Sequence, residues 1–241
     1  MKKVLIALDN SPAGKSVVAG ALALAALLDA EVEAVHVQVD GSRTARNAAE
    51  SAAVPFRTMA GPVVDRLIAA GEEEDVVALA IGARGIPAAR RPLGGTAAAV
   101  ATGLAKPVLV VPPDADPSPT FRRVLVPLEG TLSTSLAPRA IFALAAGAEI
   151  DVLALHIHDQ DSIPAFTDQP QHEQRAWARE FLLRYCPWGL GAVRLETRVG
   201  RSGELIPLVA EECDCDLIAL GWSQELSRGR AAIVRETLER S

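Results

Sequence analysis

The chain has 241 residues, enough for two compact domains or one large one. Its formal net charge of −6 excludes the clustered basic surface that neutralises phosphates, so we expect no nucleic-acid partner. A content of 49% hydrophobic but only 4% aromatic residues indicates a core of Ala, Val and Leu, typical of helices that cover a parallel sheet.

Membrane and secreted classes are also disfavoured. The longest apolar stretch, residues 17–28, is too short to span a bilayer, and we find no secretory signal. Three cysteines are an odd number and form no disulfide framework, which favours a reducing compartment. We therefore expect a cytoplasmic protein with no membrane partner.

In chain order, the first half alternates strands with helices. Short apolar runs predict buried strands at residues 3–8, 31–37, 55–59, 76–81 and 107–112. Ala/Leu-rich or amphipathic stretches predict helices at residues 14–28, 63–70 and 97–104. The segment after the second strand is short, and no helix is predicted there. This alternation indicates βαβ units and a parallel sheet with right-handed crossovers.

The second half repeats the pattern. Strands are predicted at residues 123–128, 149–157, 193–199 and 216–220, and helices at residues 135–146, 171–185, 204–212 and 231–240. Because the last helix runs to the end of the sequence, no fifth strand is predicted. The proline-rich stretch between the halves predicts a linker. We therefore expect domains at residues 1–113 and 122–241, joined by a linker at residues 114–121.

A glycine-rich loop in the first half carries the clearest chemical signal. Gly82 and Gly85 follow the fourth strand, and after nine further residues Gly95 and Thr96 open a helix. Because glycine has no Cβ, main-chain N–H groups can wrap a phosphate, and a helix N-terminus favours negative charge. Thr96 can donate its hydroxyl to a phosphate oxygen or cap the helix. The alternative is a loop whose glycines serve turn geometry only.

The spacing G-x2-G-x9-G-[ST] resembles the motif of the ATP-binding universal stress proteins, and the order of elements resembles that family twice over. The resemblance implies an α/β protein of two tandem, Rossmann-like, open parallel-sheet sandwiches with strand order 3-2-1-4-5, the second lacking its fifth strand. It also implies ATP with Mg²⁺ as the ligand of the first domain. The nucleotide-binding residues that it assigns are Ala7, Leu8, Asp9, Val37, Ile81, Gly82, Gly85, Gly95, Thr96 and Ala97.

Within this set the resemblance implies distinct roles. Asp9 lies near the ribose and phosphates or binds Mg²⁺, and Val37 and Ile81 border the adenine. The glycines and Thr96 hold the phosphates. The alternative for Asp9 is a helix cap or a loop carboxylate without a ligand.

The corresponding loop of the second half does not keep the motif. Gly221 is present, but Gln224 stands in place of the second glycine. Val234 and Arg235 stand in place of the Gly-Thr pair, and Glu129 replaces the aspartate. We expect no ATP in this half, which we interpret as a structural partner or a site for something else.

Residues 13–16 imitate a P-loop, but Asp9 stands where that motif needs a further glycine. A carboxylate there would repel phosphates, so we reject a P-loop. We interpret Asn10 or Ser11 as the cap of the following helix and Lys15 as exposed.

Two further clusters are interpreted as structural. His156 and His158 share one face of a strand, but no third ligand is evident, so we predict no metal site there. Cys213 and Cys215 form C-x-C rather than the redox motif C-x-x-C, and we interpret them as small buried residues.

These observations favour a regulatory or sensor protein of the stress response that binds ATP, and we predict no enzymatic activity. One alternative is an interaction or scaffold protein of the same family with an empty site. Another is an enzyme, a slow ATPase or an adenylyl-type transferase, for which no general base is evident. Sheet edges invite pairing, so we also expect a homodimer and a protein partner not yet identified.

Overall fold

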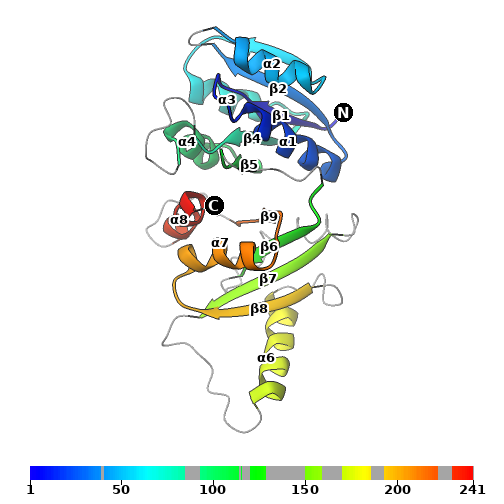
Figure 1. Cartoon of the computed structure of the whole chain (residues 1–241), viewed down its shortest axis with the longest axis vertical. Coiled ribbons are helices and arrows are strands. Elements are labelled where there is room, and N and C mark those ends of the chain that lie inside the picture. The colour runs from blue at the N-terminus through cyan, green and yellow to red at the C-terminus, as the bar shows by residue number, and fades with distance from the viewer. Residues whose placement is uncertain are drawn as a thin grey trace. The chain divides into compact units, whose positions relative to one another are not determined.

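The computed structural model of the chain describes residues 1–38, 41–84, 93–113, 115, 120–128, 150–158, 170–185, 193–221 and 230–240. The chain divides into two compact units, Met1–Thr120 and Phe121–Arg240 (Figure 1). The division falls within the predicted linker, of which residues 114 and 116–119 lie outside the described residues. No helix in the described part of the chain is long and apolar enough to cross a membrane.

Unit 1 is built on sheet A, in which all strand pairs are parallel. Its strands are β1 (Lys3–Ala7), β2 (Glu31–Val37), β3 (Phe56–Met59), β4 (Val76–Gly82) and β5 (Val108–Val111). They lie in the order β3-β2-β1-β4-β5, which confirms the predicted order. Ala7 at the end of β1 pairs with Val35 in β2 and with Ile81 in β4. The carboxyl ends of these strands therefore meet at one edge of the sheet.

Helices cover both faces of sheet A. They are α1 (Gly14–Leu28), α2 (Arg43–Ser51), α3 (Val63–Gly71) and α4 (Gly95–Gly103). Val4 and Ile6 of β1 belong to the core cluster formed with α1 and α2, whereas Leu5 and Ala7 belong to the cluster formed with α3 and α4. This alternation follows from the two-residue period of a strand.

Helix α4 is fixed by close packing against α3. A Cβ placed on Gly71 would lie 2.8 Å from Cδ1 of Leu104, and one placed on Gly103 would lie 2.6 Å from Cδ1 of Ile68. Glycine at these positions lets the two helices approach each other, because a larger residue would collide with the side chain of Leu104 or Ile68 unless that side chain moved. The N-terminus of α4 is thereby held at the carboxyl edge of the sheet.

Helix α2, which follows the second strand, was not predicted from the sequence. Its buried residues are Ala45, Ala48 and Ala49, the spacing that an amphipathic helix requires. The other residues of the helix are exposed. Because alanine is small and common on both faces of helices, this narrow stripe does not stand out in the sequence.

Unit 2 is built on sheet B, also parallel, in the order β8-β7-β6-β9. Its strands are β6 (Arg123–Pro127), β7 (Asp151–His158), β8 (Val193–Val199) and β9 (Leu217–Ile218). Its helices are α6 (Pro170–Tyr185), α7 (Ser202–Glu212) and α8 (Arg230–Arg240). The sheet has no fifth strand among the described residues, as predicted, and β9 is shorter than predicted. The predicted helix at residues 135–146 lies outside the described residues.

Both units turn from their third strand into the next helix at a glycine. Gly61 precedes α3 with a φ of 125°, and Gly200 precedes α7 with a φ of 142°. Side chains of L-amino acids rarely adopt these angles, so glycine is required at both turns. In unit 2 the Gly200 N–H also donates to the His158 carbonyl at 3.0 Å, which closes the turn.

Replacing Gly200 by alanine should therefore destabilise unit 2. The new Cβ would sit at an unfavourable φ and 3.1 Å from Cδ1 of Leu205. We expect Gly200→Ala to lower the free energy of unfolding of unit 2 by about 1 to 3 kcal/mol, measured by urea unfolding. The control is Gly95→Ala, since a Cβ at Gly95 meets nothing within 4 Å. If both variants unfolded at the same urea concentration, the expected strain in Gly200→Ala would be contradicted.

Candidate functional site

The candidate site lies at the carboxyl edge of sheet A. From β1 the chain continues to β2 and β3 on one side of the sheet and then crosses to β4 and β5 on the other side of β1. In open parallel sheets, the crevice where the strand order reverses in this way is the usual ligand site. The pairing of Ala7 with Ile81 places the loop that begins at Leu8 next to the end of β4 at Gly82.

Four of the predicted site residues meet in one apolar cluster. Ala7, Val37, Ile81 and Ala97 belong to the core between sheet A and helices α3 and α4, and each is at most 7% exposed. They come from the ends of β1, β2 and β4 and from the first turn of α4. The structure therefore gives the carboxyl edge an apolar base, as a flat aromatic ligand requires.

Leu8 is not part of this group. Its side chain packs in the opposite core cluster, with α1 and α2. Its N–H donates to the Val35 carbonyl at 2.9 Å, and its carbonyl accepts from Nδ1 of His36 at 2.8 Å. The backbone of Leu8 thus holds the edge of the sheet together, and its side chain points to the other face.

The N-terminus of α4 has no side-chain cap among the described residues. Gly94 is its N-cap residue and donates its N–H to the Ala83 carbonyl at 2.7 Å. Gly95 and Thr96 are exposed. The first N–H groups of a helix have no partner within it, so they can donate to an anion. Thr96 does not cap the helix, which leaves its hydroxyl for the other predicted role.

The folded chain does not itself need glycine at positions 82 and 95. Neither has a positive φ. A Cβ on Gly82 would make ordinary contacts at 3.4 Å with Cγ2 of Val17 and at 3.5 Å with the Arg84 carbonyl, and one on Gly95 would meet no atom of the described residues within 4 Å. Turn geometry therefore does not account for these two glycines. Gly85 lies outside the described residues.

Asp9 lies in the loop after β1 and is partly buried. Its Oδ1 accepts a hydrogen bond from the Ser11 N–H at 2.9 Å, which closes a tight turn. The carboxylate therefore has a fixed orientation at the edge of the sheet. A carboxylate so fixed can bind a hard cation through its remaining lone pairs.

The cap predicted for α1 is wrong. Ala13 occupies the N-cap position, and no side chain caps the helix. The chain makes a further turn before α1 begins, and the side chain of Asn10 bonds instead to Gly41 and Ala45. The predicted exposure of Lys15 is confirmed.

Unit 2 does not rebuild this arrangement. Helix α8 begins at Arg230, so Val234 and Arg235 lie inside the helix and not at its start. Gln224 and Glu129 lie outside the described residues. The N-terminus of α8 thus offers no Gly-Thr pair to a phosphate.

The histidines of unit 2 pack with aromatic side chains. Nδ1 of His156 donates to the Leu128 carbonyl at 2.8 Å, as Nδ1 of His36 does to Leu8 in unit 1. The His156 and His158 rings lie edge to face, 4.4 Å apart, against Trp177 of α6. No group of three or more His, Cys, Asp or Glu side chains in the described part of the chain could hold a metal ion.

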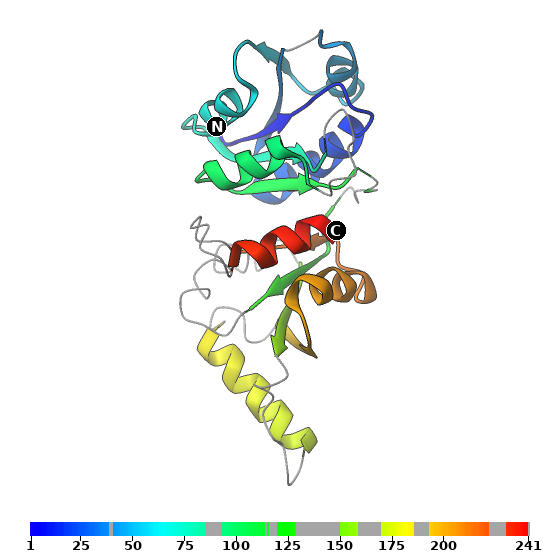
Figure 2. The same ribbon diagram turned by 90° about the vertical axis from the view of Figure 1, so that its left-hand side faces the viewer.

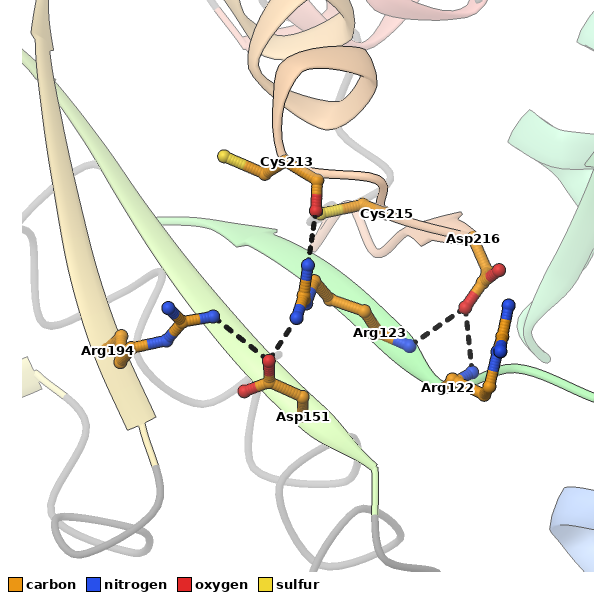
Figure 3. A network of polar contacts seen from close by, with 7 residues as sticks. All are labelled: Arg122, Arg123, Asp151, Arg194, Cys213, Cys215 and Asp216. Carbon is orange, nitrogen blue, oxygen red and sulfur yellow. Dashed lines mark hydrogen bonds and ion pairs between the residues drawn. The ribbon is translucent and has the colours of Figure 1, made fainter.

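The two described cysteines lie in a polar network at the start of sheet B (Figure 3). Arg123 donates from Nη1 to the Cys213 carbonyl at 2.6 Å and from Nε to Asp151 at 2.8 Å. Figure 3 shows Sγ of Cys213 pointing away from Cys215. Burial, with a smaller contribution from Cys213, raises the pKa of Cys215 to about 11. A thiol that stays protonated is a poor nucleophile, which agrees with a structural role.

The Cys215 thiol should therefore react slowly. In a Cys186→Ser, Cys213→Ser variant at pH 8, we expect iodoacetamide to alkylate Cys215 about a hundredfold more slowly than free glutathione, because far less thiolate is present. The rate should rise with pH until the pH approaches about 11. Alkylation as fast as that of glutathione would contradict this account.

Comparison with known proteins supports the same fold. The sequence model of the universal stress protein family matches residues 1–58 and 120–240, more than half of the chain. The matched segments leave out residues 59–119, which contain the glycine-rich loop. A search of curated proteins gives no match.

Several solved structures are similar. A universal stress protein from Archaeoglobus fulgidus DSM 4304 aligns over 99% of this chain and 93% of its own, with a TM-score of 0.63 and 16% identity. A universal stress protein in complex with cAMP aligns over 46% of this chain and 95% of its own, with 26% identity and a TM-score of 0.38. One from Archaeoglobus fulgidus in complex with dAMP covers 46% of this chain and 98% of its own, with 21% identity and a TM-score of 0.36. The first similarity extends over both units and shows the shared fold.

Proposed function

The chain belongs to the universal stress protein family, and we propose that it binds ATP with Mg²⁺ at the carboxyl edge of sheet A and acts as a regulatory protein of the stress response. Unit 2 binds no ATP in this proposal. The bound nucleotide biases the conformation of unit 1 and its choice of partner, a second copy of the chain included.

The observation that carries the proposal is the pair of glycines at positions 82 and 95. The fold accepts a Cβ at both positions without a clash. A ligand that approaches the backbone closely supplies the missing reason for glycine. Gly95 also lies at the open N-terminus of α4, where phosphate oxygens find N–H donors and a favourable helix dipole.

The other predicted residues fit the remaining parts of the ligand. The apolar base formed by Ala7, Val37 and Ile81 suits an adenine ring. The carboxylate of Asp9 suits Mg²⁺, which prefers oxygen ligands and is commonly held by one or two carboxylates together with phosphates. Mg²⁺ would offset the negative charge of the phosphates, since the chain itself has a formal net charge of −6.

We favour binding over turnover for a chemical reason. Among the described residues, the loop after β1 carries the carboxylate of Asp9, whose Oδ1 already accepts a hydrogen bond from the Ser11 N–H. A carboxylate that also neutralises a cation is a weak general base toward water. Occupancy, and not hydrolysis, is then the signal.

Calorimetric titration with ATP and Mg²⁺ tests the proposal. We expect one site with a dissociation constant on the order of micromolar in the wild-type chain. Gly95→Val should weaken binding by at least about tenfold, because the side chain would occupy the space of the phosphates. Its thermal stability should stay unchanged, because the free protein leaves that space open.

The control in unit 2 is Gly221→Ala, which changes the glycine at the position that matches Gly82 and should leave the affinity unchanged. Phosphate release is measured on the same samples. No binding by the folded wild-type chain would favour the scaffold alternative. Steady phosphate release that Asp9→Asn abolishes without loss of binding would favour an ATPase.

A further inference from the structure

The N-terminus of α2 is capped from a different part of unit 1. Ser42 occupies the N-cap position but makes no side-chain hydrogen bond to the helix. Oδ1 of Asn10 accepts a hydrogen bond from the Ala45 N–H at 3.3 Å, and Nδ2 of Asn10 donates to the Gly41 carbonyl at 3.2 Å. The loop after β1 therefore supplies the cap that α2 does not make for itself.

His36 ties the same two segments together from β2. Its Nδ1 lies 2.8 Å from the Leu8 carbonyl, and its Nε2 lies 2.9 Å from the Gly41 carbonyl. The Gly41 carbonyl thus accepts a hydrogen bond from Asn10, and Nε2 of His36 lies close to the same carbonyl. Both contacts converge on the residues just before α2, beside the loop that holds Asp9.

Among the described residues, few other contacts stabilise helix α2: the Arg46 guanidinium lies over the Phe56 ring and pairs with Glu50 at 4.0 Å. It is short, spanning Arg43–Ser51, and helices of this length are marginal on their own. It buries only alanines, and Ala48 packs closely against Gly14 of α1, where a Cβ would lie 3.3 Å away. After the helix, Ala53 adopts a φ of 54°, which is unfavourable for alanine. The cap from Asn10 is thus one of a small number of contacts that hold α2 in place.

We propose that Asn10 couples occupancy of the nucleotide site to the stability of α2. This inference rests on the proposed function, because it takes the ligand to act on Asp9. A ligand held by the Asp9 carboxylate restricts the loop after β1, and the next residue in that loop is Asn10. The amide of Asn10 then stays aligned with the Ala45 N–H, so binding stabilises α2.

The second repeat lacks the capping asparagine as well as the glycine motif, which agrees with a coupling between them. Gly130 stands at the position of Asn10 and has no side chain to cap a helix. The helix after the second strand of unit 2 is α6, which contacts β7 through the rings of Trp177 and Phe181. In Figures 1 and 2, α6 extends away from sheet B. The intact glycine motif and the capping asparagine therefore occur in the same unit.

Hydrogen exchange measured by mass spectrometry on the full chain tests the coupling. Without ligand, Asn10→Ala should speed exchange in residues 43–51 by about fivefold to tenfold, as loss of a helix cap predicts. In the wild-type chain, ATP with Mg²⁺ should slow exchange in the same segment. In Asn10→Ala the nucleotide should still bind, measured by calorimetry, but the slowing in residues 43–51 should disappear.

The matched control is Ser51→Ala, which removes the bond from Ser51 Oγ to the Ala48 carbonyl at the other end of α2. It should speed the basal exchange but keep the response to nucleotide. Nucleotide binding without any change in residues 43–51 would overturn the coupling and leave the proposed function standing. If the wild-type chain bound no nucleotide, both the coupling and the proposed function would be wrong. If hydrogen exchange in residues 43–51 were the same in ligand-free Asn10→Ala as in the wild type, Asn10 would not stabilise α2.

Discussion

Strand β1 pairs with β2 along one side and with β4 along the other, and the candidate site depends on that central position. Because all three strands are parallel, their carboxyl ends meet, and the loop that carries Asp9 leaves the sheet beside Val37 at the end of β2 and Gly82 at the end of β4. Gly71 in α3 and Gly103 in α4 let these two helices pack closely against each other. The apolar base, the carboxylate and the helix N-terminus are thus brought to one edge by backbone pairing.

The two units agree at the amino edge of their sheets and differ at the carboxyl edge. Lys3 forms ion pairs with Glu33 at 3.0 Å and Asp75 at 3.1 Å, and Arg123 forms one with Asp151 at 2.8 Å. A cation at the start of the central strand therefore joins neighbouring strands in both units. At the carboxyl edge, α4 begins with Gly95 and Thr96, whereas α8 begins at Arg230 without such a pair. The two units therefore share a scaffold and differ in the residues that start these helices.

Much of this could be predicted from the sequence, for identifiable reasons. The predicted bounds of α1 and β8 agree with the structure, because apolar runs of helical or strand length stand between polar turns. Helix α2 was missed because only alanines mark its buried face. The opposite directions of the Ala7 and Leu8 side chains follow from the two-residue period of an extended chain. The cap from Asn10 to Ala45 joins residues far apart in the sequence, and only the fold brings them together.

The central claim is that the chain carries one nucleotide site, in unit 1. Native mass spectrometry of the intact chain with saturating ATP and Mg²⁺ tests it most directly, since it counts bound nucleotides. The account predicts one nucleotide per chain in the wild type and none in Gly95→Val. Two nucleotides per chain, or one that persists in Gly95→Val, would contradict it.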